Sequence, residues 1–319
     1  MIGLDRTEEI MLGALIIDKP EGYTSHDVVA RVRRAAGTRR VGHAGTLDPF
    51  ATGVLVCCIG RATRLVQFLV GLDKEYVATV RLGYATDTQD GTGKQITPLR
   101  SSTGFGLEDV RRILSEFNGP QLQIPPMFSA KKVDGERLYR AARDGREVER
   151  DPVSIVVHSI TLIEEDVPGL SKSEDGTAEF DMQVRCSSGT YVRTLAHDIG
   201  ERLGVGAHLL TLRRTEVGHF HLTQALTLDD LKTMDREALV DELISPNDML
   251  MNLPALALDE EATRQVTNGR VLSLSSEQAA AVEPSAREVR LIDSRGTLVA
   301  VGDVDREAGL ISPRVVLAG

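Results

Sequence analysis

The sequence predicts an α+β protein: a mainly antiparallel mixed sheet flanked by helices, followed by a small β-rich C-terminal domain. Predicted strands outnumber predicted helices and lack the regular strand–helix alternation of a parallel sheet. After residue 250 the pattern changes to short strands punctuated by Gly and Pro. With 319 residues the chain is long enough for two domains, which we expect over residues 1–250 and 251–319.

Apolar spacing predicts the elements of the first domain. Apolar runs such as GALIIDK indicate buried strands, and strict alternation as in KEYVATVRLGY indicates half-buried ones. In chain order this gives strands over 13–19, 54–60, 74–84, 154–165, 177–188 and 207–222, and helices over 25–37 (with Ser25 as N-cap), 62–70, 108–117, 138–143 and 191–204 (ended by Gly204). The segment 119–150, rich in Pro, Gly and charge, is predicted to be an exposed insertion.

The C-terminal residues are predicted to form a hairpin and short strands. Apolar alternation on both sides of DSRG (293–296) indicates two strands joined by a tight turn. Gly and Pro punctuate the strands that follow, so this region is expected to be β-rich.

Charge is distributed unevenly along the chain. The net charge is −10, yet residues 20–64 hold seven arginines against three carboxylates, a net charge of +4. Residues 229–319 hold nine basic and seventeen acidic residues, a net charge of −8. Such asymmetry is typical of a nucleic-acid face on an acidic protein, although clustered arginines also occur on solvated helix faces.

Cysteine usage and the N-terminus indicate a cytoplasmic protein. Cys57, Cys58 and Cys186 have no zinc-site spacing and give no disulfide framework, so we expect buried thiols in a reducing compartment. The start MIGLDRTEEI is too acidic for a signal peptide, and no apolar run approaches the roughly 18 residues of a membrane helix. We expect neither a metal nor a membrane partner.

Two further patterns resemble ligand sites but are better explained by ordinary structure. ATDTQDGTGK (85–94) lacks both the calcium-loop and the phosphate-loop spacing, which favours a turn. His208, His219 and His221 have no Cys or carboxylate spaced to complete a metal site, which favours strand histidines.

Asp48 stands alone among Gly, Thr and Pro in GHAGTLDPFATG (42–53). A glycosidase would need a second carboxylate, and no other acid in the chain has so distinctive a setting. A lone Asp in such a loop often forms an Asx-turn. It can also act as a nucleophile when an arginine keeps it ionised, so the residues alone leave both interpretations open.

Several long motifs follow one another along residues 10–222. They are DKPEGYTSHDVV (18–29), RRVGHAGTLDPFATGVLVCCIGRATR (39–64), KEYVATVRLGYATDTQDGTG (74–93), PPMFSAKKVDGERLYRAARDG (125–145), CSSGTYVRTLAHDIGERLG (186–204) and GAHLLTLRR (206–214). In this order they closely resemble the TruB-type tRNA pseudouridine synthases, which isomerise uridine 55 in the T loop of tRNA. The resemblance implies the pseudouridine synthase fold and, more weakly, a PUA-like C-terminal domain.

The resemblance also implies roles for individual residues. Asp48 matches the nucleophile, Arg193 the arginine that pairs with it, and Tyr76 the tyrosine that stacks on the target base and takes part in proton transfer. Tyr191 and Leu212 match substrate-pocket positions. The remaining matches are His43, which enters the T loop, and Lys19 and Pro20, which belong to a structural motif that buttresses the catalytic loop.

The same resemblance identifies tRNA as the partner and requires no cofactor. It makes residues of about 120–152 an RNA-binding thumb. Candidate contacts to the RNA backbone are Arg39, Arg40, Lys131, Lys132 and Arg137. Two other functions remain as alternatives: a non-catalytic tRNA-binding or tRNA-folding protein on the same scaffold, and a nucleoside hydrolase. The lack of a long apolar surface helix favours a monomer.

Overall fold

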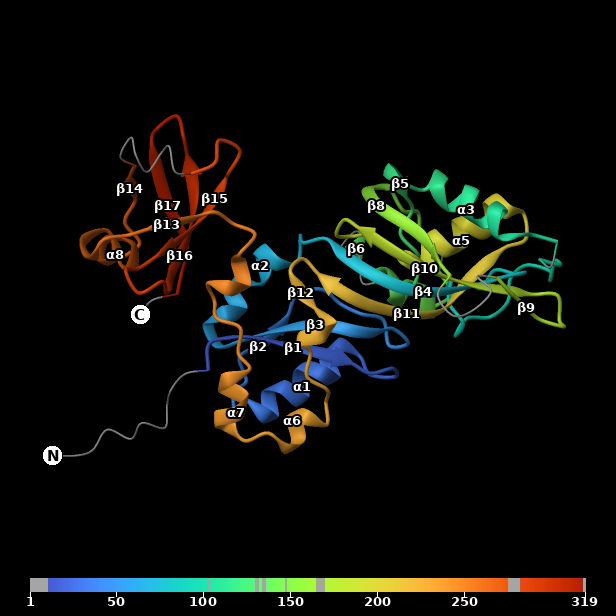
Figure 1. Cartoon of the computed structure of the whole chain (residues 1–319), viewed down its shortest axis with the longest axis horizontal. Coiled ribbons are helices and arrows are strands. Elements are labelled where there is room, and N and C mark those ends of the chain that lie inside the picture. Colours follow the sequence, from blue (N-terminus) through green and yellow to red (C-terminus); the bar gives the residue numbers. More distant parts are fainter. Residues whose placement is uncertain are drawn as a thin grey trace. The chain divides into compact units, whose positions relative to one another are not determined.

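The structure, a computed structural model, describes residues 11–102, 104–129, 132–133, 136–146, 148–164, 170–274 and 282–317. Figure 1 shows the whole chain, which divides into two compact units. Unit 1 comprises Met1–Asp48, Val54–Val70 and Gly218–Gly319, and unit 2 comprises Pro49–Gly53 and Gly71–Val217. This division groups residues differently from the expected boundary near residue 250, which stays a prediction.

Unit 2 contains the mostly antiparallel sheet that the sequence predicts. Its strands lie in the order β11-β4-β10-β8-β5, and each neighbouring pair is antiparallel. The first two residues of β3 pair in parallel with β11, which makes the sheet mixed. Helices α3 and α5 cover one face of this sheet (Figure 1). The bounds are β3 Thr52–Ile59, β4 Lys74–Leu82, α3 Leu107–Glu116, β5 Gly119–Gln123, β8 Val153–Ile163, β9 Ser171–Lys172, β10 Ala178–Cys186, α5 Val192–Leu203 and β11 Ala207–Val217.

The predicted periodicities of unit 2 are confirmed. Along β4 every second residue is buried, as the alternation in KEYVATVRLGY requires. Helix α5 ends where Gly204 adopts a left-handed conformation with φ of 75°, which glycine tolerates without steric cost. Among the described residues, no helix is long and apolar enough to cross a membrane.

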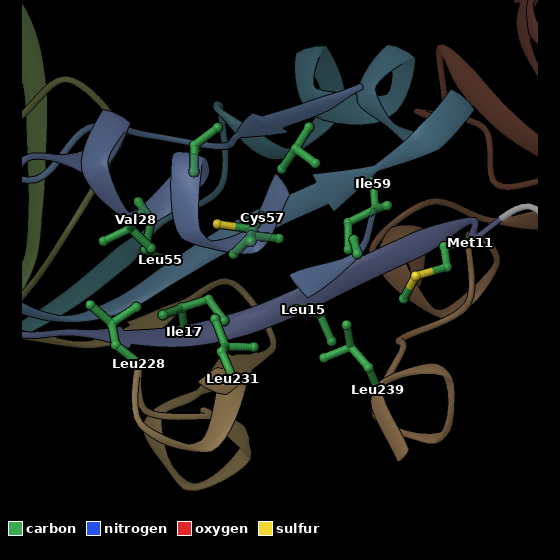
Figure 2. Packing of buried hydrophobic residues seen from close by; sticks show 14 residues of the cluster. Met11, Leu15, Ile17, Val28, Leu55, Cys57, Ile59, Leu228, Leu231 and Leu239 are labelled. Carbon is green, nitrogen blue, oxygen red and sulfur yellow. The ribbon is translucent and has the colours of Figure 1, made fainter. Parts of the chain in front are cut away.

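Unit 1 is built on β1 and β2, which both pair with β3. Figure 2 shows its core, where Leu15 and Ile17 of β1 and Leu55 of β3 pack with Val28 of α1 and Leu231 of α6. Residues far apart in the sequence therefore share one apolar core. The bounds are β1 Gly13–Lys19, α1 Ser25–Ala35, β2 Val41–His43, η1 Gly60–Leu65, α2 Val66–Leu69, β12 Phe220–His221, η2 Leu222–Gln224, α6 Asp230–Thr233, α7 Arg236–Asp241 and η3 Asp248–Leu250.

The C-terminal residues form a separate five-stranded sheet in the order β13-β15-β16-β17-β14. The predicted hairpin around DSRG is present as the antiparallel pair of β15 and β16. The sheet has its own apolar core and contacts η1 through a 2.6 Å hydrogen bond from Arg64 Nη1 to the Val316 carbonyl. The β-rich character is thus confirmed. The bounds are β13 Ala255–Ala257, α8 Glu260–Thr267, β14 Leu272–Ser273, β15 Glu288–Ile292, β16 Leu298–Asp305 and β17 Leu310–Val316.

The N-terminus of α1 differs from the prediction. Thr24, not Ser25, is the N-cap, because Thr24 Oγ1 accepts a hydrogen bond from the Asp27 N–H at 3.1 Å. The Asp27 carboxylate in turn accepts from the Thr24 N–H at 2.9 Å, which completes a capping box. Ser25 is the first helical residue, and its hydroxyl is free to bond elsewhere.

The predicted insertion over 119–150 begins with a strand that was not predicted from the sequence. Residues 119–123 form the edge strand β5. Its Pro120 and its Leu122, which is 69% exposed, interrupt the apolar alternation by which a strand is predicted from sequence. The predicted helix over 138–143 is confirmed as α4 (Leu138–Arg143), preceded by the two-residue strands β6 (Lys132–Val133) and β7 (Glu136–Arg137).

Gly53, the second residue of β3 and just after the loop that carries Asp48, is required by its conformation and its surroundings. Its φ is 102°, and a Cβ there would lie 2.1 Å from the Arg214 carbonyl oxygen. We expect Gly53→Ala to lower the free energy of unfolding by more than about 2 kcal/mol, measured by urea unfolding. Gly189→Ala is the control, because Gly189 has φ of 84° but nothing within 4 Å of the added Cβ. Equal decreases in the two variants would show that the close approach to Arg214 is unimportant.

Candidate active site

Asp48 lies in the loop between β2 and β3, at the end of a segment of unit 1. The loop leaves the sheet after Ala44, whose N–H donates to the Val56 carbonyl at 3.0 Å. Gly45 then turns the chain with φ of 102°, a conformation that favours glycine. Leu47 is buried with 4% exposure and Asp48 is half-buried. The segment Gly-Thr-Leu-Asp thus bends away from the sheet, with the buried Leu47 immediately before the acid.

His43 is the last residue of β2 and pairs across the strands with Cys57. Its ring meets the ring of His26 edge to face, with centroids 5.8 Å apart and an interplanar angle of 81°. His26 is exposed in the first turn of α1. Sequence reasoning selected His43 and missed His26, since only the fold brings this turn beside β2.

Tyr76 and Leu212 lie on one face of the unit 2 sheet. Tyr76 of β4 is opposite Arg214 of β11, and Leu212 is opposite Ala78. Residues directly opposite each other in a sheet point to the same face, as do residues two apart. Tyr76 is 8% exposed and Leu212 is 6% exposed. The structure therefore brings these two predicted pocket residues together on adjacent strands.

Arg193 lies in the first turn of α5 with only 4% of its side chain exposed. Its Nη1 donates to the Thr88 carbonyl at 2.8 Å, and its Nη2 donates to the Phe128 carbonyl at 2.7 Å. Its Nη1 also lies 3.5 Å from Oδ2 of Asp90. A buried guanidinium held on several sides has a fixed direction. The predicted pairing with Asp48, which belongs to unit 1, stays a prediction.

Asp90 is a buried carboxylate that sequence reasoning did not select. It is 4% exposed and accepts hydrogen bonds from Thr88 Oγ1 at 2.7 Å, from the Thr92 N–H at 3.0 Å and from Thr92 Oγ1 at 2.5 Å. Asp90 belongs to the segment 85–94, which was predicted to be a turn. This segment contacts α5 through the hydrogen bond and the ion pair that Arg193 forms with Thr88 and Asp90. The sequence DTQDGT is typical of a turn in which an Asp side chain bonds to the nearby backbone. The burial of Asp90 beside Arg193, by contrast, depends on the fold.

Tyr191 is held in place by a buried glutamine. The Tyr191 N–H donates to Gln123 Oε1 at 2.8 Å, and Gln123 Nε2 donates to the Tyr191 carbonyl at 3.0 Å. Gln123 is the last residue of β5 and is 2% exposed. These two hydrogen bonds fix the N-cap residue of α5, two positions before Arg193. Gln123 was also missed, because the strand that carries it was not predicted.

Comparison with known proteins identifies the family of this chain. The model of the TruB family pseudouridylate synthase (N terminal domain) matches residues 33–192, and the model of the tRNA pseudouridylate synthase B C-terminal domain matches residues 193–252. The chain belongs to the TruB family. It is therefore a pseudouridylate synthase, an isomerase, as the sequence motifs indicate.

Relatives in the TruB family are similar over most of the chain. A tRNA pseudouridine synthase B of Opitutus terrae is 48% identical over 73% of this chain and 92% of its own length. That of Geobacter sulfurreducens is 44% identical over 92% of this chain and 93% of its own length. Among solved structures, a Cbf5-Nop10-Gar1 complex contains a chain with a TM-score of 0.71 and 26% identity, over 96% of this chain and 85% of that one. These similarities support the pseudouridine synthase fold of this TruB chain.

The RNA-backbone candidates of this TruB chain are described to different extents. Arg39 and Arg40 are exposed, and within the described part of the chain neither forms an ion pair. Lys131 lies outside the described residues, as do the side chains of Lys132 and Arg137. Residues 22–23 and the exposed face of α1 form a surface pocket of about 480 Å³. Two arginines that precede Arg39 in the sequence, Arg31 and Arg34, line this pocket.

Lys74 begins the strand that carries Tyr76 and is 7% exposed. Burial, together with the nearby charge of Arg214, lowers the pKa of Lys74 to about 8. The ammonium is thus mostly charged at pH 7. Because this folded-state pKa lies below the ordinary value of 10.5, the unfolded chain binds more protons between pH 8 and 10.5. The contribution of Lys74 to stability therefore rises with pH across that window.

Neither the cysteines nor the histidines form a metal cluster within the described residues. Cys57, Cys58 and Cys186 are buried free thiols, as predicted, and burial raises the pKa of Cys186 to about 11. His208 Nδ1 lies 3.0 Å from the Tyr84 carbonyl, and His219 Nε2 lies 2.9 Å from the Asp248 carbonyl. Both histidines therefore have ordinary structural partners.

Proposed function

We propose that this pseudouridylate synthase acts on tRNA and isomerises uridine 55 in the T loop, with Asp48 as the nucleophile. The observation that carries the proposal is the 48% identity with a protein named tRNA pseudouridine synthase B, and the Gly-rich loop motif that contains Asp48 supports it. Tyr76 and Leu212 on one sheet face and the buried guanidinium of Arg193 supply the other parts of the expected site.

The chemistry suits these residue types. Isomerisation breaks the bond from ribose C1′ to uracil N1 and forms a bond from C1′ to uracil C5. The proton displaced from C5 leaves as one is gained at N1, so the composition of the RNA is unchanged and no redox equivalent is consumed. The base must leave its stack, at a cost of a few kcal/mol, and lie against an aromatic face such as Tyr76. An ionised carboxylate at Asp48, aimed in advance, then attacks the uridine, and the bond that it forms breaks again before the product leaves, which restores the carboxylate.

Two other functions would fit parts of this arrangement. A tRNA-binding or tRNA-folding protein would need the basic surface but not Asp48, Tyr76 and Arg193 together. A nucleoside hydrolase would use the nucleophilic Asp48 but would pass the ribose to water and release free uracil. The membership of the chain in a family of pseudouridylate synthases favours the isomerase.

The reaction class is tested by incubating the wild-type protein with an unmodified tRNA transcript. Chromatography of the nucleoside digest separates pseudouridine from uridine, which has the same mass, and analysis of the supernatant measures uracil. We expect one pseudouridine per tRNA and no uracil. Release of uracil would indicate the hydrolase, and stable tRNA binding without either product would indicate the non-catalytic protein.

RNA binding by the arginine cluster gives a separate prediction. The double variant Arg39→Gln/Arg40→Gln is expected to weaken tRNA binding, most strongly at low salt. It should also reduce the slope of log Kd against log salt by about 0.7–0.9 for each phosphate that the two arginines neutralise. The control is Arg112→Gln/Arg264→Gln, which removes the same charge from two arginines already paired with Glu116 and Glu261. An unchanged slope in the first variant would remove Arg39 and Arg40 from the interface.

A further inference from the structure

One hydroxyl holds the residue before Asp48. Ser25 Oγ accepts a hydrogen bond from the Leu47 N–H at 3.0 Å and donates one to the Leu47 carbonyl at 3.2 Å. Ser25 is 2% exposed and Leu47 is 4% exposed, so water has little access to these groups. A single side chain, 22 residues earlier in the sequence, therefore satisfies both backbone groups of Leu47.

These bonds act on the direction of the Asp48 side chain. The Leu47 carbonyl and the Asp48 N–H belong to the same planar peptide unit. Fixing the carbonyl fixes that plane, and rotation of the plane would swing the Cα–Cβ bond of Asp48. Gly45, which precedes Leu47 in the loop and has φ of 102°, does not restrict the backbone in this way, because glycine is the least restricted residue.

Ser25 itself sits on a rigid support. It is the first residue of α1, directly after the N-cap Thr24 and within the capping box that Thr24 forms with Asp27. The helix buries Val28, Val29 and Val32 in the core of unit 1. The capped helix end thus cannot shift without loss of the capping bonds and of core packing.

We propose that Ser25 is a positioning residue for Asp48, which it aims through the Leu47–Asp48 peptide. The proposal rests on the proposed role of Asp48 as nucleophile. Removal of the hydroxyl leaves the Leu47 N–H and C=O buried without their partner, so the loop must rearrange to satisfy them. Since a displacement of about 1 Å at a reacting group can cost about a hundred-fold in rate, the effect falls on the chemical step.

The test compares Ser25→Ala with Ser102→Ala. Ser102 is a matched control, fully buried, whose Oγ donates to the carbonyls of Gly176 at 3.0 Å and Leu82 at 3.4 Å in unit 2. With a tRNA transcript as substrate, Ser25→Ala is expected to lower kcat and the single-turnover rate by about ten- to a hundred-fold, with KM changed less than about three-fold. Ser102→Ala is expected to change each value by less than about three-fold. Hydrogen exchange of the Leu47 amide should be faster only in Ser25→Ala.

Two conservative variants keep the proposal testable if Ser25→Ala does not fold. Ser25→Thr retains the hydroxyl and should recover most of the rate. Ser25→Cys retains the size of the side chain but bonds weakly, and should lower kcat without raising KM. Equal decreases of kcat in the Ser25 and Ser102 variants, or an effect confined to KM, would overturn the positioning role. Absence of pseudouridine with the wild-type protein would instead overturn the proposed function.

Discussion

Replacing Asp48 with Asn is expected to abolish pseudouridine formation while tRNA binding survives. The amide of Asn has nearly the size of the carboxylate but carries no charge and is not a nucleophile, so the covalent step is lost. Loss of a nucleophile typically lowers kcat by a thousand-fold or more, about 4 kcal/mol in the activation free energy. The measurement is the single-turnover rate on a T-arm stem-loop, together with Kd for the same RNA.

The control for this variant is Asp175→Asn. Asp175 also lies in a loop between two strands, β9 and β10, and its carboxylate accepts hydrogen bonds from the N–H and Oγ1 of Thr177. We expect its rate to stay within about three-fold of the wild type. Measurable turnover by Asp48→Asn, at more than about a hundredth of the wild-type rate, would contradict nucleophilic attack by Asp48.

Replacing Arg193 with Met is expected to reduce both stability and rate. The change removes the hydrogen bonds to the Thr88 and Phe128 carbonyls and leaves the buried carboxylate of Asp90 without its cation. Breaking a buried pair by removing one partner costs about 3–5 kcal/mol of unfolding free energy. The rate falls as well if Arg193 holds Asp48 ionised, because a protonated carboxyl group is a poor nucleophile.

A second variant separates these effects. Arg202→Met changes the same helix, but Arg202 is 61% exposed and pairs with Glu116 on the surface. A surface pair of this kind contributes about 1 kcal/mol or less. The double variant Arg193→Met/Asp90→Asn should be less destabilised than the sum of its two single changes, since no unpaired charge remains. Equal unfolding free energies for Arg193→Met and Arg202→Met would contradict the buried role of Arg193.

The fold could be predicted wherever one face of an element is buried. Strand β4 shows this, because its alternation of buried and half-buried residues appears directly in the sequence. Strand β5 shows the opposite case, since it is a five-residue edge strand with Pro120 and an exposed Leu122. The capping of α1 was also misplaced by one residue, because Thr24 and Ser25 are both good N-cap residues and only the geometry separates them.

The site could be predicted for residues in distinctive motifs, and not for the residues that hold them. Asp48, Tyr76 and Arg193 were selected through the family resemblance. Asp90 and Ser25 are polar residues whose importance comes from burial and from partners more than 20 residues away. Such pairings depend on how the units fold, and a single sequence carries no direct signal for them.

The most direct test of the proposed function is a nucleotide-resolution map of pseudouridine in a full-length, unmodified tRNA after incubation with the wild-type protein. The expected result is one new pseudouridine, at position 55, which is absent after incubation with Asp48→Asn. A transcript with cytidine at position 55 should remain unmodified throughout. Pseudouridine at another position, with uridine 55 intact, would contradict the proposed site choice.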